Sequence, residues 1–113
     1  MDRDRAYFLD ILESARLALT YVQGLTEADF LADVQCQDSV IRRLEIIGEA
    51  ARRLSLQTRA AHPDIPWHEI IGMRNLMIHD YDDLDLETVW DTVQRDVPRL
   101  VEWIDPLFRP RAD

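Results

Sequence analysis

The stretch Arg74-Asn75-Leu76-Met77-Ile78-His79-Asp80-Tyr81 places a guanidinium, an imidazole and a phenol within eight residues of one another. The residues around them are mostly apolar, so exposure to water does not by itself explain these polar side chains. An arginine can neutralise a phosphate, a histidine can transfer a proton near neutral pH, and a tyrosine hydroxyl can accept a transferred group. Together these residue types indicate phosphodiester chemistry.

The spacing of these residues restricts how their side chains can meet. On a regular helix, Arg74 and Tyr81 project within about 20° of each other, whereas His79 projects roughly 140° away from Arg74. The three side chains can therefore share one site only if the helix ends near Ile78 or if a second subunit completes the site. A structural alternative fits the same residue types: His79 caps the C-terminus of the helix, where a cation is favoured, and Arg74 pairs with a nearby acid.

Four arginines form a second candidate site on a predicted long helix. They are Arg42, Arg43, Arg52 and Arg53. Arg42 and Arg53 project within about 20° of each other on a helix, so part of the set forms a basic stripe that can bind the phosphates of RNA. A solvated helix face with ion pairs to Glu45 and Glu49 explains these arginines at least as well.

The remaining candidates for metal or covalent chemistry are weak. The three histidines have no spacing typical of a metal site. His68-Glu69 resembles the opening of a zinc-protease motif, but Gly72 stands where the second histidine ligand is needed. Cys36 has no clear neighbouring base and is predicted to be a small buried residue. We therefore expect neither a metal nor a cofactor.

Length and composition favour one small helical domain. The chain has 113 residues, 47% hydrophobic residues and three glycines, which predicts a single domain over residues 1–113. Its net charge of −9 argues against a nucleic-acid footprint over the whole surface. There is no apolar run of membrane-spanning length, no signal-type segment after the charged N-terminus, and a single cysteine. These features favour a cytoplasmic protein without a membrane association.

Apolar residues at three- and four-residue spacing predict two long helices. The first covers residues 7–22 and is closed by Gly24. Thr26 is a candidate N-cap for a short helical turn, with Asp29 at the capping-box position. The second long helix is expected over residues 33–56. Its apolar residues cover more of the helix surface than one helix–helix contact buries. This suggests contact with a second copy of the chain as well as with its own bundle.

Two further helices are expected after a proline-rich break. Pro66 suits the first position of a third helix, which is expected over residues 67–78. Asp85 is a candidate N-cap for a last helix that extends to about residue 107, and Pro98 is expected to kink it or loosen one turn. No segment has the alternation of a strand. The sequence therefore predicts an all-α fold, a four-to-five-helix up-and-down bundle, assembled as a homodimer.

Three segments of the chain resemble one protein family. They are Asp38-Ser39-Val40-Ile41-Arg42-Arg43-Leu44-Glu45-Ile46-Ile47-Gly48-Glu49-Ala50, then Ile65-Pro66-Trp67, then Gly72-Met73-Arg74-Asn75 through His79-Asp80-Tyr81. These segments resemble the HEPN superfamily and, within it, the HepT-type toxins of bacterial and archaeal toxin–antitoxin pairs. Found together with the other two segments, the pattern Arg-x4-His-x-Tyr with asparagine directly after arginine is a specific signal of this family. The sequence does not depart from it.

The resemblance implies a function and a role for each residue of the motif. It implies the toxin of a type VII toxin–antitoxin system, a metal-independent endoribonuclease that dimerises and builds its RNA cleft at the subunit interface. Arg74 and His79 are then the catalytic pair, and Asn75 is the accompanying polar residue. Tyr81 matches the tyrosine to which the partner antitoxin, an MntA-type minimal nucleotidyltransferase, transfers AMP from ATP. We add that six acids between Asp80 and Asp91 suit the docking of a basic partner.

Two other functions stay open. Relatives in the same superfamily are substrate-binding companion subunits of nucleotidyltransferases, with a four-helix bundle and no nuclease activity of their own. A purely supportive subunit has less need of an intact Arg-x4-His-x-Tyr motif. The third reading is a helical dimerisation protein in which Arg74 and His79 are structural.

Overall fold

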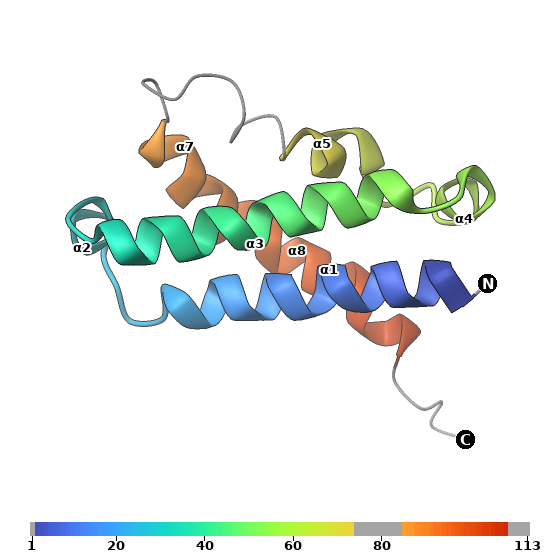
Figure 1. Cartoon of the computed structure of the whole chain (residues 1–113), viewed down its shortest axis with the longest axis horizontal. Helices are drawn as coiled ribbons and strands as arrows, with labels where there is room; N and C mark the ends of the chain where they lie inside the picture. Colours follow the sequence, from blue (N-terminus) through green and yellow to red (C-terminus); the bar gives the residue numbers. More distant parts are fainter. Residues whose placement is uncertain (1, 74–84, 109–113) are drawn as a thin grey trace.

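The computed structural model describes residues 2–73 and 85–108, and within these ranges the chain forms helices and no strand. The elements are α1 (Asp2–Tyr21), α2 (Glu27–Leu31), α3 (Val34–Arg53), α4 (Leu56–Ala61), α5 (Trp67–Gly72), α7 (Leu86–Asp91), the π-helical turn η1 (Thr92–Asp96), α8 (Val97–Ile104) and the 3-10 turn η2 (Asp105–Leu107). Figure 1 shows α1 and α3 side by side and antiparallel, with α8 passing across them. The predicted all-α, HEPN-like bundle is confirmed.

The connection between α1 and α3 is built from local signals in the sequence. Gly24 has a φ of +79°, a left-handed conformation that suits glycine because it has no Cβ. Thr26 accepts a hydrogen bond from Asp29 N, and the Asp29 carboxylate accepts one from Thr26 N, so the predicted capping box is present. Asp33 caps α3 by accepting from Cys36 N at 3.0 Å. The turn at Gly24 reverses the direction of the chain after α1, and the caps at Thr26 and Asp33 fix where α2 and α3 begin.

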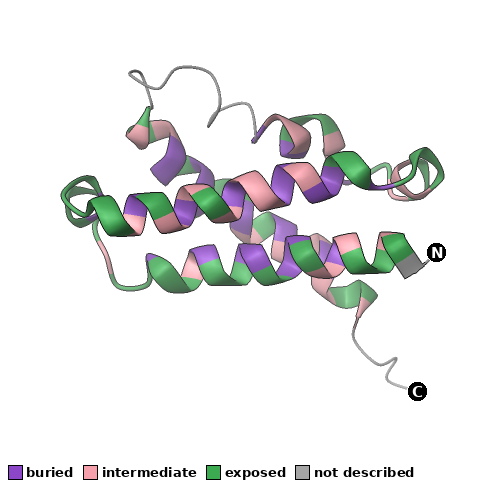
Figure 2. Cartoon of the chain, in the orientation of Figure 1, coloured by how far each residue is buried: buried purple, intermediate pink, exposed green. Residues whose placement is uncertain are grey.

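The core lies between α1, α3 and α8. Ile11 and Ala15 of α1, Leu44 and Ile47 of α3, and Leu100 of α8 are at most 1% exposed. Burying one such Leu or Ile side chain contributes about 1.5–3 kcal/mol. Figure 2 shows buried and exposed positions alternating along both long helices, as expected for amphipathic helices with one face in the core.

The second long helix ends earlier than predicted. We expected one helix to residue 56, but α3 ends at Arg53 and Leu54 has an extended ψ of 144°. Ser55 then caps a new short helix, α4, by accepting from Thr58 N at 3.1 Å. At this break Ser55 also bonds to Asp4 of α1, a partner distant in the sequence.

The last helix contains a change of helical register. Asp85 caps α7 as predicted, and the following turn, η1, is π-helical: Val97 N–H donates to Thr92 O, five residues back. Pro98, at the start of α8, has no N–H to donate to the preceding turn. The loosened turn expected around Pro98 is therefore found just before it. Helical structure therefore runs without a gap from Leu86 through η1 to Ile104, and Figure 1 shows α7 leading into α8.

In the part of the chain that the structure describes, no helix is both long enough and apolar enough to cross a membrane.

Candidate functional site

The motif residues Arg74, Asn75, His79 and Tyr81 lie outside the described residues, as does the end of the predicted third helix beyond Met73. The structure describes the two anchors of this segment: Met73 on its N-terminal side and Asp85 on its C-terminal side. Each anchor is tied to the bundle by a different kind of interaction.

The N-terminal anchor is α5, which packs against α3. Pro66, expected as the first residue of this helix, is its N-cap instead: α5 begins at Trp67, and the Pro66 carbonyl accepts from Ile70 N at 3.1 Å. Ile70 and Met73 are 1% and 5% exposed. The Trp67 indole N–H donates to the carbonyls of Arg59 and His62, both at 3.1 Å. Buried apolar contacts and these hydrogen bonds hold the residue that immediately precedes Arg74.

The C-terminal anchor is the capped start of α7. The Asp85 carboxylate accepts from Thr88 N at 3.1 Å and from the Thr88 hydroxyl at 2.7 Å. These hydrogen bonds to Thr88 lower the pKa of Asp85, so it is a fully ionised cap at neutral pH. Trp90 packs on Phe30 of α2 with ring centroids 5.4 Å apart. In Figure 1 α5 and α7 lie on the same side of α3, so both anchors of the motif segment are on one side of the bundle.

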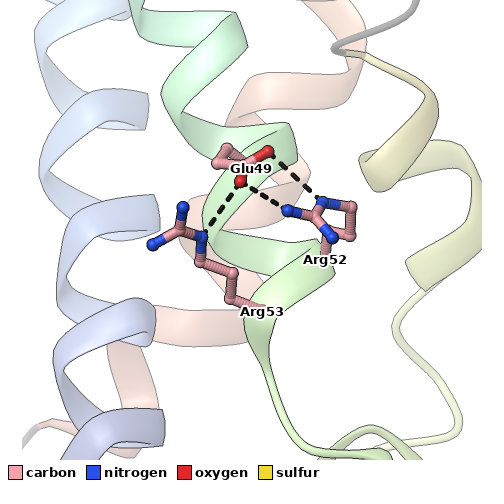
Figure 3. Close-up of polar contacts among 3 residues, drawn as sticks. All are labelled: Glu49, Arg52 and Arg53. Atoms are coloured by element: carbon pink, nitrogen blue, oxygen red, sulfur yellow. Dashed lines mark hydrogen bonds and ion pairs between the residues drawn. The ribbon is translucent and has the colours of Figure 1, made fainter.

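The arginines of α3 are described, and two of them form ion pairs. Arg52 contacts Glu49 at 2.7 Å and Arg53 contacts the same carboxylate at 3.0 Å, as Figure 3 shows. Hydrogen bonding to Glu49 raises the pKa of Arg52 and of Arg53. The predicted pairing with Glu49 is therefore present. Among the described residues no ion pair joins an arginine to Glu45.

The structure brings together Arg42 and Arg53, as their helical spacing predicts. Both line a groove of about 390 Å³ between α1 and α3, whereas Arg43 and Arg52 are not among its lining residues. The groove is also lined by three acids, Asp10, Glu45 and Glu49, and by Tyr7. Its charge is mixed rather than basic, which weakens the electrostatic attraction that a bare arginine stripe has for phosphate.

Cys36 has the surroundings of a structural cysteine. Its thiol lies 3.6 Å from the carbonyl oxygen of Tyr21, and the residue is half-buried rather than fully buried as predicted. Partial burial, and secondly the Asp33 carboxylate, raises the pKa of the Cys36 thiol. A raised pKa leaves little thiolate at neutral pH, so Cys36 is a poor nucleophile. Within residues 2–73 and 85–108, no cluster of three potential ligands is arranged to hold a metal ion.

Sequence reasoning missed one feature, a pocket between α5 and α8 that includes Trp103. Trp103 falls outside the apolar series of the last helix, which passes through Leu100 and Ile104 instead. The only signal for the pocket in the sequence was that this tryptophan lies outside the row of apolar residues with which the helix faces the core. Such a residue covers the edge of a core and can leave part of its ring accessible.

Comparison with known proteins identifies the family. The family model described as Ribonuclease HepT-like matches residues 11–107. A protein of Methanocaldococcus jannaschii named "Gamma-glutamylcyclotransferase and putative RNase MJ0434" is 42% identical over 100 residues, which cover 88% of this chain but 45% of that protein. This chain thus spans less than half the length of that relative, whose name joins two activities.

Two other relatives match over most of their own length. "Putative RNase MJ1380" of Methanocaldococcus jannaschii is 36% identical over 89% of this chain and 93% of that protein. "Probable ribonuclease HepT" of Thermococcus cleftensis is 40% identical over 83% of this chain and 86% of that protein. No solved structure matches the chain. The match over residues 11–107 and these identities confirm the resemblance seen in the motif segments: the chain belongs to the Ribonuclease HepT-like family.

Proposed function

We propose that this protein is a metal-independent endoribonuclease, the toxin of a type VII toxin–antitoxin system, and that it acts in the cytoplasm as a homodimer. One observation carries the proposal: a chain of the HepT-like ribonuclease family has an intact Arg74-x4-His79-x-Tyr81 motif, with Asn75 after the arginine. The names of the relatives support RNA as the substrate.

The motif supplies what RNA cleavage without a metal requires. The 2′-OH of RNA attacks the adjacent phosphorus, the 2′-O–P bond forms, and the P–O bond to the 5′ oxygen of the next nucleotide breaks. His79 removes the proton from the 2′-OH or donates one to the leaving 5′ oxygen, and such a step contributes about 10²–10⁴-fold. Arg74 offsets the charge that grows on the phosphoryl oxygens, and its planar fork suits two of them at once.

A homodimer gives the reaction both an acid and a base. Each copy brings one His79, so two copies provide a base for the 2′-OH and an acid for the leaving group. Ile41 and Ile46 of α3 are only half-buried within a single chain, which leaves apolar surface for a second copy. Three acids line the groove between α1 and α3 together with Arg42 and Arg53, so the groove is not part of the proposed RNA contact.

The proposed silencing reaction acts on Tyr81. An MntA-type nucleotidyltransferase transfers AMP from ATP to the Tyr81 hydroxyl: the phenolic oxygen bonds to the α-phosphorus, and pyrophosphate leaves. The attached AMP brings bulk and negative charge two residues from His79, which blocks the cleft and repels RNA. The acids between Asp80 and Asp91 suit docking of a basic surface on this partner.

The experiment that tests the chemistry uses an RNA with one defined cut. Replacing the ribose on the 5′ side of that cut with deoxyribose removes the attacking hydroxyl, and we expect cleavage there to stop while other cuts continue. The 5′ fragment of the unmodified RNA is expected to end in a 2′,3′-cyclic phosphate. Continued cleavage at the deoxyribose position would rule out attack by the 2′-OH. Cleavage of no RNA by a sample whose intact mass lacks AMP would rule out the nuclease.

A further inference from the structure

A pocket of about 280 Å³ lies between α5 and α8. We call it the α5–α8 pocket. Its apolar walls include Met73, Leu100 and Trp103, and its charged lining residues are Glu69, Asp96 and Arg99. Its volume is just below the ~300–1,000 Å³ usual for small-ligand sites, so it suits one flat ring system rather than a large ligand.

One wall of the pocket is formed by Met73, the residue that precedes the proposed catalytic motif in the sequence. Met73 is the last described residue before Arg74, and its buried side chain forms part of the pocket wall. On the opposite side, Asp96 is the last residue of the π-helical turn η1. A ligand in this pocket therefore contacts Met73, the residue that directly precedes Arg74 in the sequence.

Trp103 has the environment of a stacking platform rather than of a core residue. It is half-buried against the core, so its ring is partly accessible from the pocket. Its indole N–H has no acceptor among residues 2–73 and 85–108, whereas the N–H of Trp67 bonds to two carbonyls. Stacking on a tryptophan is the common way in which proteins hold an unpaired base.

The charged residues of the pocket favour a base over a phosphate. Glu69, Asp96 and Arg99 are exposed, and none of them forms an ion pair within the described part of the chain. With two carboxylates and one guanidinium, the lining has a net negative charge that repels a phosphate. The carboxylates can, however, accept hydrogen bonds from the N–H groups of a base. Arg99 adds a donor fork of the kind that matches O6 and N7 of guanine. Guanine is the base that presents this acceptor pair together with N1–H and N2–H donors for carboxylates.

We propose that the α5–α8 pocket binds one unpaired guanine of the RNA, stacked on Trp103, and so selects where the RNA is cut. The proposal rests on the proposed ribonuclease function for its substrate. The edge contacts are assigned to Arg99 as donor and to Glu69 and Asp96 as acceptors. Uracil, which has no exocyclic amine and a single N–H donor, is the base that the pocket accepts least.

Binding is measured apart from cleavage. The probes are four fluorescent 2′-O-methyl oligouridylates that differ in one central base, and the blocked 2′ oxygen prevents their cleavage. We expect the guanine probe to bind at least about fivefold more tightly than the uracil probe. Trp103→Ala is expected to weaken binding of the guanine probe by about 5- to 150-fold, which corresponds to the free energy of base–aromatic stacking. Arg99→Ala and Glu69→Gln change exposed residues. Both are expected to lower the ratio of the affinity for the guanine probe to that for the uracil probe toward one.

The matched control is Arg95→Ala. Arg95 is an exposed arginine four residues before Arg99 and does not line the pocket, so its loss changes the net charge equally and is expected to keep the ratio. Circular dichroism checks that each variant folds. If Trp103→Ala fails to fold, Arg99→Ala and Glu69→Gln carry the test.

The outcomes separate this proposal from the proposed function. RNA cleavage with equal binding of all four probes, or with a ratio that survives Arg99→Ala, overturns the base pocket and leaves the nuclease standing. A guanine preference that depends on Arg99, in a protein whose intact mass lacks AMP and that cleaves no RNA, supports the pocket and overturns the nuclease. Loss of the dimer in Arg99→Ala without any change in the ratio assigns the pocket to a protein contact and overturns the proposal.

Discussion

Asp4 on α1 and Ser55 at the start of α4 are 51 positions apart in the chain and are joined by two hydrogen bonds. Ser55 N–H donates to the Asp4 carboxylate at 3.0 Å, and the Ser55 hydroxyl donates to it at 2.7 Å. The Thr58 hydroxyl donates to the same carboxylate. Hydrogen bonds from Thr58, followed by those from Ser55, lower the pKa of Asp4 from 3.8 to about 2. This contact ties the end of α3 and the start of α4 to α1.

Asp4→Asn is expected to lower the free energy of unfolding at pH 7 by about 1 kcal/mol, because the amide accepts fewer hydrogen bonds than the carboxylate. The folded pKa lies below the unfolded value, so the ionised form stabilises the fold above about pH 4, and this contribution is lost as pH falls toward about 2. Urea unfolding of wild type and variant should therefore differ at pH 7 and converge near pH 2. Asp10→Asn, an exposed acid of the same helix, is the control. Equal stability of wild type and Asp4→Asn at pH 7 would show that the contact contributes nothing.

Leu44→Ala is expected to destabilise the fold by about 2–5 kcal/mol, because Leu44 of α3 is fully buried in the core and its truncation leaves a cavity. Leu17→Ala, on the outer side of α1 at 38% exposure, is expected to change stability by about 0.5 kcal/mol or less. Thermal unfolding followed by circular dichroism compares the two. Similar effects of both substitutions would contradict the placement of the core.

The Cys36 thiol is expected to react slowly with iodoacetamide at neutral pH. Burial and Asp33 raise its pKa, so the thiolate fraction at pH 7 is smaller than in the unfolded chain. The labelling rate, measured by mass spectrometry from pH 6 to pH 10, should rise with a midpoint above that of the protein in urea. A midpoint at or below the unfolded value would show that Cys36 has an activated thiol.

Tyr81→Phe is expected to abolish AMP transfer by the cognate nucleotidyltransferase, because the acceptor oxygen is absent. Intact mass after incubation with the partner and ATP is the measurement. Tyr21→Phe, at an exposed tyrosine of α1, is expected to be modified like wild type. A variant lacking the Tyr81 hydroxyl that still gains the mass of AMP would place the acceptor elsewhere.

Much of the fold could be predicted from the sequence because its signals are local. The capping residues Thr26 and Asp85 were recognisable from their position before an apolar series, and both accept the predicted backbone hydrogen bonds. The long-range contacts could not be predicted in this way. Nothing next to Ser55 indicates that Asp4 reaches it, and that contact accompanies the end of α3 at Arg53 instead of residue 56.

The candidate site was predicted only in part. The family and its motif follow from the identities and spacing of Arg74, His79 and Tyr81, because such a pattern requires no knowledge of the fold. The roles of these residues remain predictions. The α5–α8 pocket could not be predicted, since Glu69 and Trp103 come from helices whose relative placement depends on packing.

The central claim is tested most directly by incubating RNA with purified wild type and with His79→Ala, both in excess EDTA. Intact mass first establishes that neither sample carries AMP. We predict that wild type cleaves the RNA under these conditions and that His79→Ala, with the same helical content by circular dichroism, loses at least about 10²-fold in rate. Equal cleavage by both proteins, or cleavage by wild type only when Mg²⁺ is restored, would contradict a metal-independent nuclease that uses His79.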